Sequence, residues 1–352
     1  IIFGDIGTSP LYVIKAIVGY KIITEELVLG GVSCVFWTLL IITTFKYVIL
    51  ALNADNKGEG GIFALYAQVR RYKSPLLIYP AIIGCATLIA DGFITPPISI
   101  SSAIEGLKIL NPDIHTMPIV IVIIILLFAF QQVGTEIVGK TFGPIMFVWF
   151  TMIGVLGLMQ IIEHPEVFKA INPYYAFNLL ANYPHGFWLL GAVFLCTTGG
   201  EALFSDLGHC GKMNVRISWS FVLTSLLLTY FGQSAWLLSN KMGTTLEKGT
   251  SVFYSLMPEW FLPIGICVAS IATIIASQAL ISGVFTLVNE AMKLRLWFRM
   301  KVNFPSTQKG QIYIPGINWF LMFGCIVVVL IFKNATNMEA AYGLAIIVDM
   351  IM

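Results

Sequence analysis

Three acidic side chains lie inside apolar segments, where an ionised group is costly: Asp5 in FGDIGTSPLY, Asp91 in TLIADGFITPP and Glu201 in LCTTGGEALFSD. Placing such a group at the centre of a bilayer costs about 2.5–3.5 kcal/mol on insertion scales. None has a Lys or Arg within one helical turn, since Lys15 is nearly three turns from Asp5. The pattern predicts a cation or proton site inside a membrane. A capping carboxylate that only holds the fold is the alternative for each acid, most of all for Asp91.

Hydroxyl groups gather around the same three segments. A weakly hydrated monovalent ion is selected by neutral oxygens that replace its water shell, whereas divalent sites use more carboxylates at short range. Hydroxyls beside one or two acids therefore favour a monovalent ion, although any one hydroxyl alone fits a helix–helix hydrogen bond as well. The hydroxyl residues are Thr8, Ser9, Tyr12, Thr95, Thr197, Thr198 and Tyr342.

Helix-breaking residues flank two of the acids. Gly4, Gly7 and Pro10 surround Asp5, and Gly199-Gly200 precede Glu201. A glycine inside a helix costs about 1 kcal/mol relative to alanine, and a proline costs about 3 kcal/mol. Membrane helices tolerate freed backbone groups only where protein or a watery cavity satisfies them. Broken helices at corresponding positions of two halves point to a transporter's binding site, so we predict a five-span repeat with breaks in the first and sixth spans.

The elements that position these residues are apolar runs long enough to cross a membrane. The 352 residues are 58% hydrophobic and 11% charged, against about 25% charged in soluble domains. A spanning helix needs about 20 apolar residues. A tenth run from Glu339 has only fourteen residues, so we expect the transmembrane domain, 1–352, to continue beyond it. The runs are 1–18, 29–52, 76–104, 117–133 and 140–162 in the first five-span unit (1–162), and 186–206, 214–238, 259–292 and 316–333 in the second (186–352).

Loop charges predict the orientation of these spans. With alternating sides, 13 of the 20 basic residues fall at the loops after the even-numbered spans. Since a Lys/Arg excess marks the cytoplasmic face, the first span starts inside the cell. The loops 53–75 and 293–315 are then cytoplasmic, and we expect a multi-pass plasma-membrane protein.

Several other functions are excluded or disfavoured. The six cysteines are scattered singly, which favours membrane-embedded hydrophobes over a metal site or disulfides. The segment NADNKGEGG at 53–61 lacks the GxxxxGK[ST] spacing of a phosphate loop, so it is interpreted as a cytoplasmic turn or gate. No basic stripe suggests nucleic acid. No nucleophile–base pair appears either, so we expect neither an enzyme nor a cofactor.

Several longer segments resemble a known family, the Kup/HAK/KT potassium transporters. The likeness covers essentially the whole chain in order. It implies proton-coupled potassium uptake, the five-plus-five inverted-repeat fold of the amino acid–polyamine–cation superfamily, about twelve spans and a soluble C-terminal tail. The matching segments are GDIGTSPLY (4–12), DNKGEGGIFALY (55–66), ITPPISISSAIEGL (94–107), IASQALISGVFTL (275–287), GQIYIPGINW (310–319) and AAYGLA (340–345).

The resemblance also implies roles for individual residues. Asp91 stands where many members have glutamate, and Asp349 stands where threonine or a small residue is expected, which leaves the tenth span's role open. Glu201 is the first candidate for proton coupling and Asp91 the second. Potassium ligands are expected at Asp5, Tyr12, Thr198 and Tyr342, with Thr8, Asp91, Thr95 and Glu201 completing the potassium-binding set.

The sequence thus predicts an all-α potassium symporter that works by alternating access. One alternative is an amino-acid transporter of the same fold, although three acids disfavour binding a substrate carboxylate. Another is a potassium channel or a membrane sensor without proton coupling. Expected partners are potassium, protons and lipid; further candidates are a second copy of the chain and a cytoplasmic regulatory nucleotide or tail.

Overall fold

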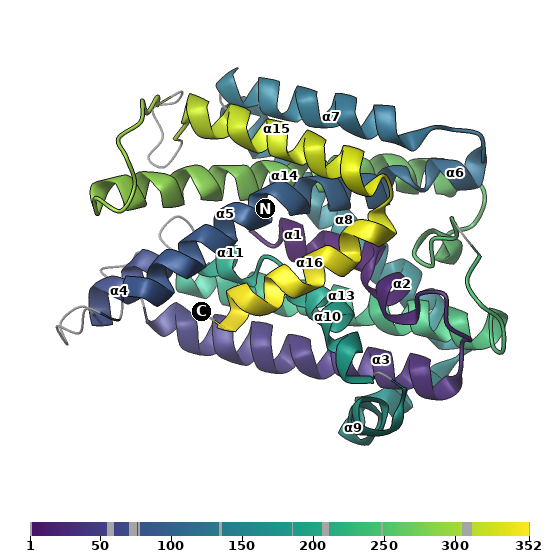
Figure 1. The fold of residues 1–352 in the computed structure, drawn as a ribbon. Helices are drawn as coiled ribbons and strands as arrows, with labels where there is room; N and C mark the ends of the chain where they lie inside the picture. Colours follow the sequence, from purple (N-terminus) through teal and green to yellow (C-terminus); the bar gives the residue numbers. More distant parts are fainter. Residues whose placement is uncertain are drawn as a thin grey trace.

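The computed structural model describes residues 2–54, 60–69, 76, 78–133, 136–184, 186–205, 211–247, 249–304 and 312–351. These residues form helices and short connections, and their only extended pairings are the isolated bridges Ile22–Thr245 and Asn303–Tyr313. The elongated bundle that results is shown in Figure 1. An all-α fold, as predicted, is confirmed.

The first apolar run is divided into three helical pieces, α1 (Gly4–Thr8), the 3₁₀ turn η1 (Ser9–Leu11) and α2 (Val13–Val18). Tyr12, between η1 and α2, has φ −133° and ψ −23°, which lies outside the helical region. The pieces run from the middle of the bundle toward its right-hand end in Figure 1. The predicted break in the first span is therefore present.

The sixth apolar run is broken as well. Helix α10 (Leu190–Phe194) continues as the 3₁₀ turn η9 (Leu195–Thr197) and is followed by α11 (Gly200–Ser205). Thr198 is extended in ψ at 139°, and Gly199 takes φ +79°. A left-handed residue at this point ends one helix and starts another, which is a role that glycine fills without steric cost.

Longer helices enclose these two broken segments. Within the described part of the chain, six stretches are long and apolar enough to cross a membrane, among them Glu25–Asn53, Ile78–Leu110 and Leu262–Lys293. The long helices are α3 (Glu25–Thr38) with its π-helical extension η2 (Leu39–Leu50), α5 (Ile78–Ile104), α7 (Thr116–Phe130), α8 (Glu136–Glu163), α13 (Lys212–Asn240), α14 (Leu262–Lys293), α15 (Pro315–Phe332) and α16 (Ala335–Ile351).

The remaining elements are short and connect the long helices. Helix α9 interrupts the loop between the fifth and sixth runs, where the sequence predicted only a connection, and it packs against α3. The short connecting elements are η3 (Ala51–Asn53), α4 (Ile62–Val69), α6 (Leu107–Leu110), η6 (Gln131–Val133), η7 (Pro165–Ile171), α9 (Pro173–Asn182), η8 (Gly186–Leu189) and η10 (Tyr254–Leu256).

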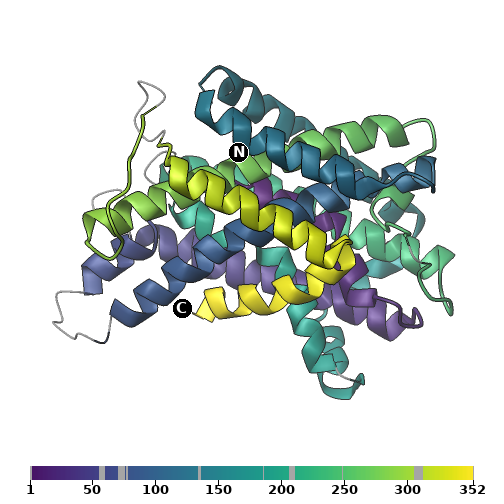
Figure 2. The same ribbon diagram turned by 45° about the horizontal axis from the view of Figure 1, so that its top comes forward.

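Packing places three helices directly around the breaks. Helix α14 packs on α1, and α5 packs on η1. Helix α16 lies beside α5 in both Figure 1 and Figure 2 and contacts η9 as well. At Gly4 a Cβ would come within 2.9 Å of Ala276 Cα, so glycine here allows α1 and α14 to approach closely.

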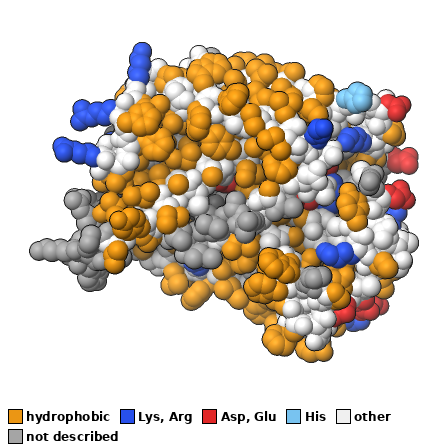
Figure 3. All heavy atoms as spheres, viewed as in Figure 1, with side chains coloured by type: hydrophobic (Ala, Val, Ile, Leu, Met, Phe, Trp, Pro, Cys, Tyr) orange, Lys and Arg blue, Asp and Glu red, His pale blue; other side chains and the backbone are white. Residues whose placement is uncertain are grey.

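Side-chain types are segregated along the molecule. In Figure 3 an apolar surface covers the middle, Lys and Arg project from the left end, and Asp and Glu gather at the right end. An apolar band of this kind is what a lipid bilayer requires of a polytopic protein. The chain is therefore an all-α, multi-pass membrane protein.

Candidate functional site

The two broken segments meet through their hydroxyl groups. Ser9 Oγ and Thr198 Oγ1 are 2.9 Å apart and share a hydrogen bond, although 189 residues separate them in the sequence. Ser9 Oγ also lies 3.4 Å from the hydroxyl of Tyr12. Ser9, Tyr12 and Thr198 are all buried. The breaks of the first and sixth runs thus form one polar centre inside the bundle.

Gly199 brings the backbone of the sixth run against Asp5. A Cβ at position 199 would lie 2.9 Å from Asp5 Cβ and 3.1 Å from Asp5 Oδ2. The positive φ and this close approach both require glycine. The carboxylate of Asp5 therefore faces the turn between η9 and α11.

Asp5 is 5% exposed, and its carboxylate keeps its acceptor capacity. Thr8 and Ser9 donate to its backbone carbonyl, at 2.9 Å and 3.3 Å, and not to its side chain. The Thr198 hydroxyl is a polar neighbour of the Asp5 carboxylate. Neither carboxylate oxygen, however, accepts a hydrogen bond of normal geometry from the residues that the structure describes. Because buried acceptors need a partner, this carboxylate suits a cation or a proton.

A second polar set lies on α5 and α16. Thr95 Oγ1 donates to Asp91 Oδ1 over 2.6 Å, one helical turn away on α5. The same hydroxyl makes a short hydrogen bond to the Tyr342 hydroxyl of α16. All three side chains are buried. Helix α5 passes through Pro96 and Pro97 without a break, so the prolines leave Asp91 and Thr95 on one helical face.

The two polar sets belong to one site. Helix α5, which carries Asp91 and Thr95, packs against both α1 and η1, and α16, which carries Tyr342, packs against both α5 and η9. The first and third apolar runs and α16 therefore contribute to one buried cluster of carboxylates and hydroxyls. Of the eight residues predicted to bind potassium, the structure brings Asp5, Thr8, Tyr12, Asp91, Thr95, Thr198 and Tyr342 into this region.

Two predicted residues are not described at the side-chain level. Glu201 lies within α11 and Asp349 within α16, but their side chains fall outside the described residues. Residues 55–59 of the glycine-rich segment 53–61, which was predicted to be a cytoplasmic turn or gate, also fall outside them. The assignment of proton coupling to Glu201 stays a prediction.

Several supporting contacts were not anticipated from the sequence. The broken first run leaves backbone carbonyls free, and neighbouring helices satisfy them: Trp149 Nε1 donates to Gly7 O at 3.0 Å, and Gln233 Nε2 donates to Pro10 O at 2.9 Å. A Gln inside the apolar run of α13 was the available sequence signal. These two donors satisfy backbone carbonyls of the broken segment and leave the side-chain oxygens of the polar centre unoccupied by them.

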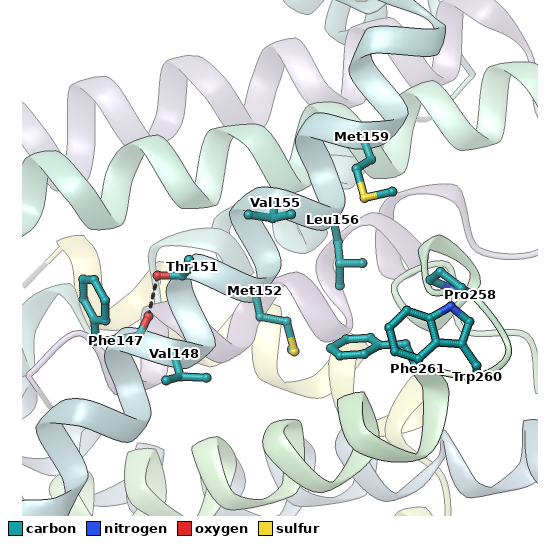
Figure 4. A pocket seen from close by; sticks show the side chains of 10 residues that line it. All are labelled: Phe147, Val148, Thr151, Met152, Val155, Leu156, Met159, Pro258, Trp260 and Phe261. Carbon is teal, nitrogen blue, oxygen red and sulfur yellow. Dashed lines mark hydrogen bonds between the residues drawn. The ribbon is translucent and has the colours of Figure 1, made fainter.

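An apolar groove of about 430 Å³ lies elsewhere, between α8 and residues 258–261. Figure 4 shows its lining, in which Thr151 turns its hydroxyl back to the carbonyl of Phe147. Aliphatic, aromatic and thioether side chains line the remainder, including Met152, Trp260 and Phe261. A cation would find no charged ligand on these side chains, so the buried polar cluster is the candidate ion site.

Comparison with known proteins assigns the family. A family model described as the K+ potassium transporter integral membrane domain matches residues 1–352. The probable potassium transport system protein Kup of Flavobacterium johnsoniae is 59% identical over 359 residues, covering 100% of this chain and 54% of that protein. The corresponding protein of Cytophaga hutchinsonii is 60% identical over 357 residues, with the same coverage.

A more distant relative agrees. The probable potassium transport system protein Kup of Enterococcus faecalis is 50% identical over 368 residues, covering 100% of this chain and 55% of that protein. The chain spans about half the length of the curated relatives that it matches. The match of the family model over the whole chain, together with these identities, shows that the chain belongs to the K+ potassium transporter family.

Proposed function

We propose that the chain forms the ion-conducting part of a proton-coupled potassium uptake transporter. The observation that carries this proposal is the meeting of two broken helices at a buried acid, where Ser9 and Thr198 join the breaks and the Asp5 carboxylate keeps both oxygens without a normal hydrogen bond from the described residues. Relatives named potassium transport proteins support the identity of the ion.

Potassium would lie between α1 and the η9–α11 turn. Asp5 supplies the charge, and Tyr12, Thr198 and Tyr342 supply neutral oxygens, with Thr8, Asp91 and Thr95 in support. Neutral oxygens in a flexible cage favour an ion that is dehydrated easily. The negative ends of helix dipoles at the breaks add to the attraction for a cation.

Coupling to protons would use a second acid near the ion. Burial favours the protonated form of a carboxyl group, whereas a neighbouring cation favours the ionised form. Glu201 is the first candidate and Asp91 the second. Movement of the two five-span repeats relative to each other would then open the site to one side at a time.

Uptake of radioactive rubidium into proteoliposomes tests this function. A pH step, acidic outside, should drive rubidium above its equilibrium level, and unlabelled potassium should compete where sodium and amino acids do not. Competition by amino acids would favour the solute-transporter alternative. Equilibration without accumulation would favour a channel.

A further inference from the structure

A second group of charges lies next to the ion site, on the side that the loop charges predict to be non-cytoplasmic. Lys15 Nζ on α2 is 3.1 Å from Glu105 Oε2 at the end of α5, and both side chains are largely buried, at 13% and 11% exposed. Glu339 of α16 is 3% exposed. These three residues are called the outer charge cluster below.

Glu105 is fully engaged in this cluster. One of its carboxylate oxygens accepts from Lys15, and the other accepts from the backbone N–H of Ala335 at 3.1 Å. Ala335 is the first residue of α16, so the acid also sits at the positive end of a helix dipole. The ion pair therefore ties α2 and α5 to the beginning of α16.

Glu339 is not engaged in the same way. Neither of its carboxylate oxygens has a hydrogen-bond partner among the residues that the structure describes, and it forms no ion pair within 4.0 Å there. The charges of Lys15 and Glu105 are nevertheless close enough to interact electrostatically with the Glu339 carboxylate. With one cation and two acids, the cluster carries a net charge of −1 when Glu339 is ionised and is neutral when Glu339 is protonated.

The outer charge cluster shares its helices with the ion site. Lys15 follows Tyr12 by three residues, and Glu339 precedes Tyr342 by three residues. Within α16, residues three apart such as Glu339 and Tyr342 lie on one helix face, about 4.5 Å apart along the axis at 1.5 Å per residue. Tyr12 directly precedes the first residue of α2. Helix α2 and the beginning of α16 come together at the right-hand side of the bundle in Figure 1.

Among the residues that the structure describes, the other elements packed against α16 offer Glu339 no further cation. The sequence of α10 has no ionisable residue, and η9 and α15 contribute only the thiols of Cys196 and Cys325. Helix α5 contributes Tyr79, Cys85 and Asp91, and Glu105 directly follows its last residue. A potassium ion needs several oxygen ligands, and both carboxylate oxygens of Glu105 already accept hydrogen bonds from Lys15 and Ala335, whereas a proton needs only one carboxylate oxygen. The chemistry of the cluster therefore favours a proton as the occupant.

We propose that Glu339 binds a proton taken from the non-cytoplasmic water, and that this neutralises the outer charge cluster and favours its closed form above the ion site. The proton adds to one carboxylate oxygen, and Lys15 then pairs with Glu105 alone. Loss of the proton leaves a buried charge of −1, which favours opening toward water. The inference rests on the proposed function, because it uses the proton of that function as a signal for closure.

Two readouts on the full-length protein test this inference. In proteoliposomes, rubidium uptake by the wild type should vary with external pH by up to about tenfold per pH unit, as one protonation allows. Uptake by Glu339→Gln should vary less steeply with external pH and keep only the dependence that the coupling acid contributes. In infrared difference spectra between two pH values, the carbonyl band of a protonated carboxylic acid should disappear in Glu339→Gln.

A matched control is Glu163→Gln, because Glu163 is an exposed acid on the same predicted side. It should keep both the pH profile and the band. Glu339→Asp keeps a carboxyl group and should restore the pH response with a shifted band; if Glu339→Gln does not reach the membrane, an unshifted band in Glu339→Asp overturns the inference.

A wild-type pH profile or an unchanged band in Glu339→Gln would also overturn it. If wild-type uptake does not respond to pH at all, the proposed coupling fails, and the infrared band alone then decides whether Glu339 binds a proton.

Discussion

Gly199→Ala tests the close approach of the sixth run to Asp5. The substitution has two effects, a backbone cost at a positive φ and a new contact with Asp5. At φ +79°, a residue with a Cβ costs about 1–2 kcal/mol. The new methyl group would also lie 2.9 Å from Asp5 Cβ, whereas carbon atoms in contact are normally about 3.5–4.0 Å apart. Asp5 or the turn must therefore move by roughly 1 Å, and the carboxylate leaves its place at the site.

The expected effect follows from the energy of one ionic interaction. An interaction with a charged group contributes about 1.5–3 kcal/mol, and every 1.4 kcal/mol is tenfold in affinity. The half-saturating rubidium concentration of Gly199→Ala should therefore rise by roughly ten- to a hundredfold. Concentration-dependent rubidium uptake in proteoliposomes, normalised to protein that is folded by size-exclusion chromatography, measures it.

Gly243→Ala is the matched control. Gly243 has φ +75° and nothing within 4 Å of an added Cβ, so the substitution carries the same backbone cost without touching Asp5. Both variants should lose similar thermal stability, and Gly243→Ala should keep the wild-type half-saturating concentration. Equal shifts in the two variants, or no shift in Gly199→Ala, would refute the placement of Asp5 at the site.

Three further predictions concern the ion and the acids. Uptake should prefer potassium, rubidium and caesium over sodium, because neutral oxygens dominate the site; equal sodium and potassium transport in proteoliposomes would contradict this. Asp5→Asn keeps the shape and removes the charge, so expression should survive while rubidium uptake falls severely, and near-normal uptake would show that the acid is structural. Glu201→Gln should abolish accumulation driven by a pH gradient while binding persists, whereas Asp91→Asn should impair uptake but leave the remainder pH-driven; the reverse result would exchange the two roles.

The breaks were predictable because their cause is local. Gly199-Gly200 and the Gly4–Pro10 segment are poor in helix propensity, and the structure divides both runs there. The buried acids were predictable for the same reason, since the residue type contradicts its apolar neighbours. The inverted arrangement of two five-span repeats stays a prediction.

Long-range partners were not predictable from a single sequence. Lys15 and Glu105 are 90 residues apart in the sequence, and the residues around each of them do not predict that the two side chains form an ion pair. Glu339 served only to mark the beginning of the tenth run, because a polar residue at the end of an apolar run has an ordinary explanation. The π-helical stretch Leu39–Leu50 also has no local signal, because its composition resembles that of an α-helical span.

The most direct test of the central claim is the position of the ion itself. A structure of the full-length protein in rubidium, with the ion located by its anomalous scattering, should show a peak between the Asp5 carboxylate and the turn at Thr198–Gly199. The phenols of Tyr12 and Tyr342 should face that peak, and it should be lost in Asp5→Asn. A rubidium peak at another place in the bundle, retained in Asp5→Asn, would contradict the account.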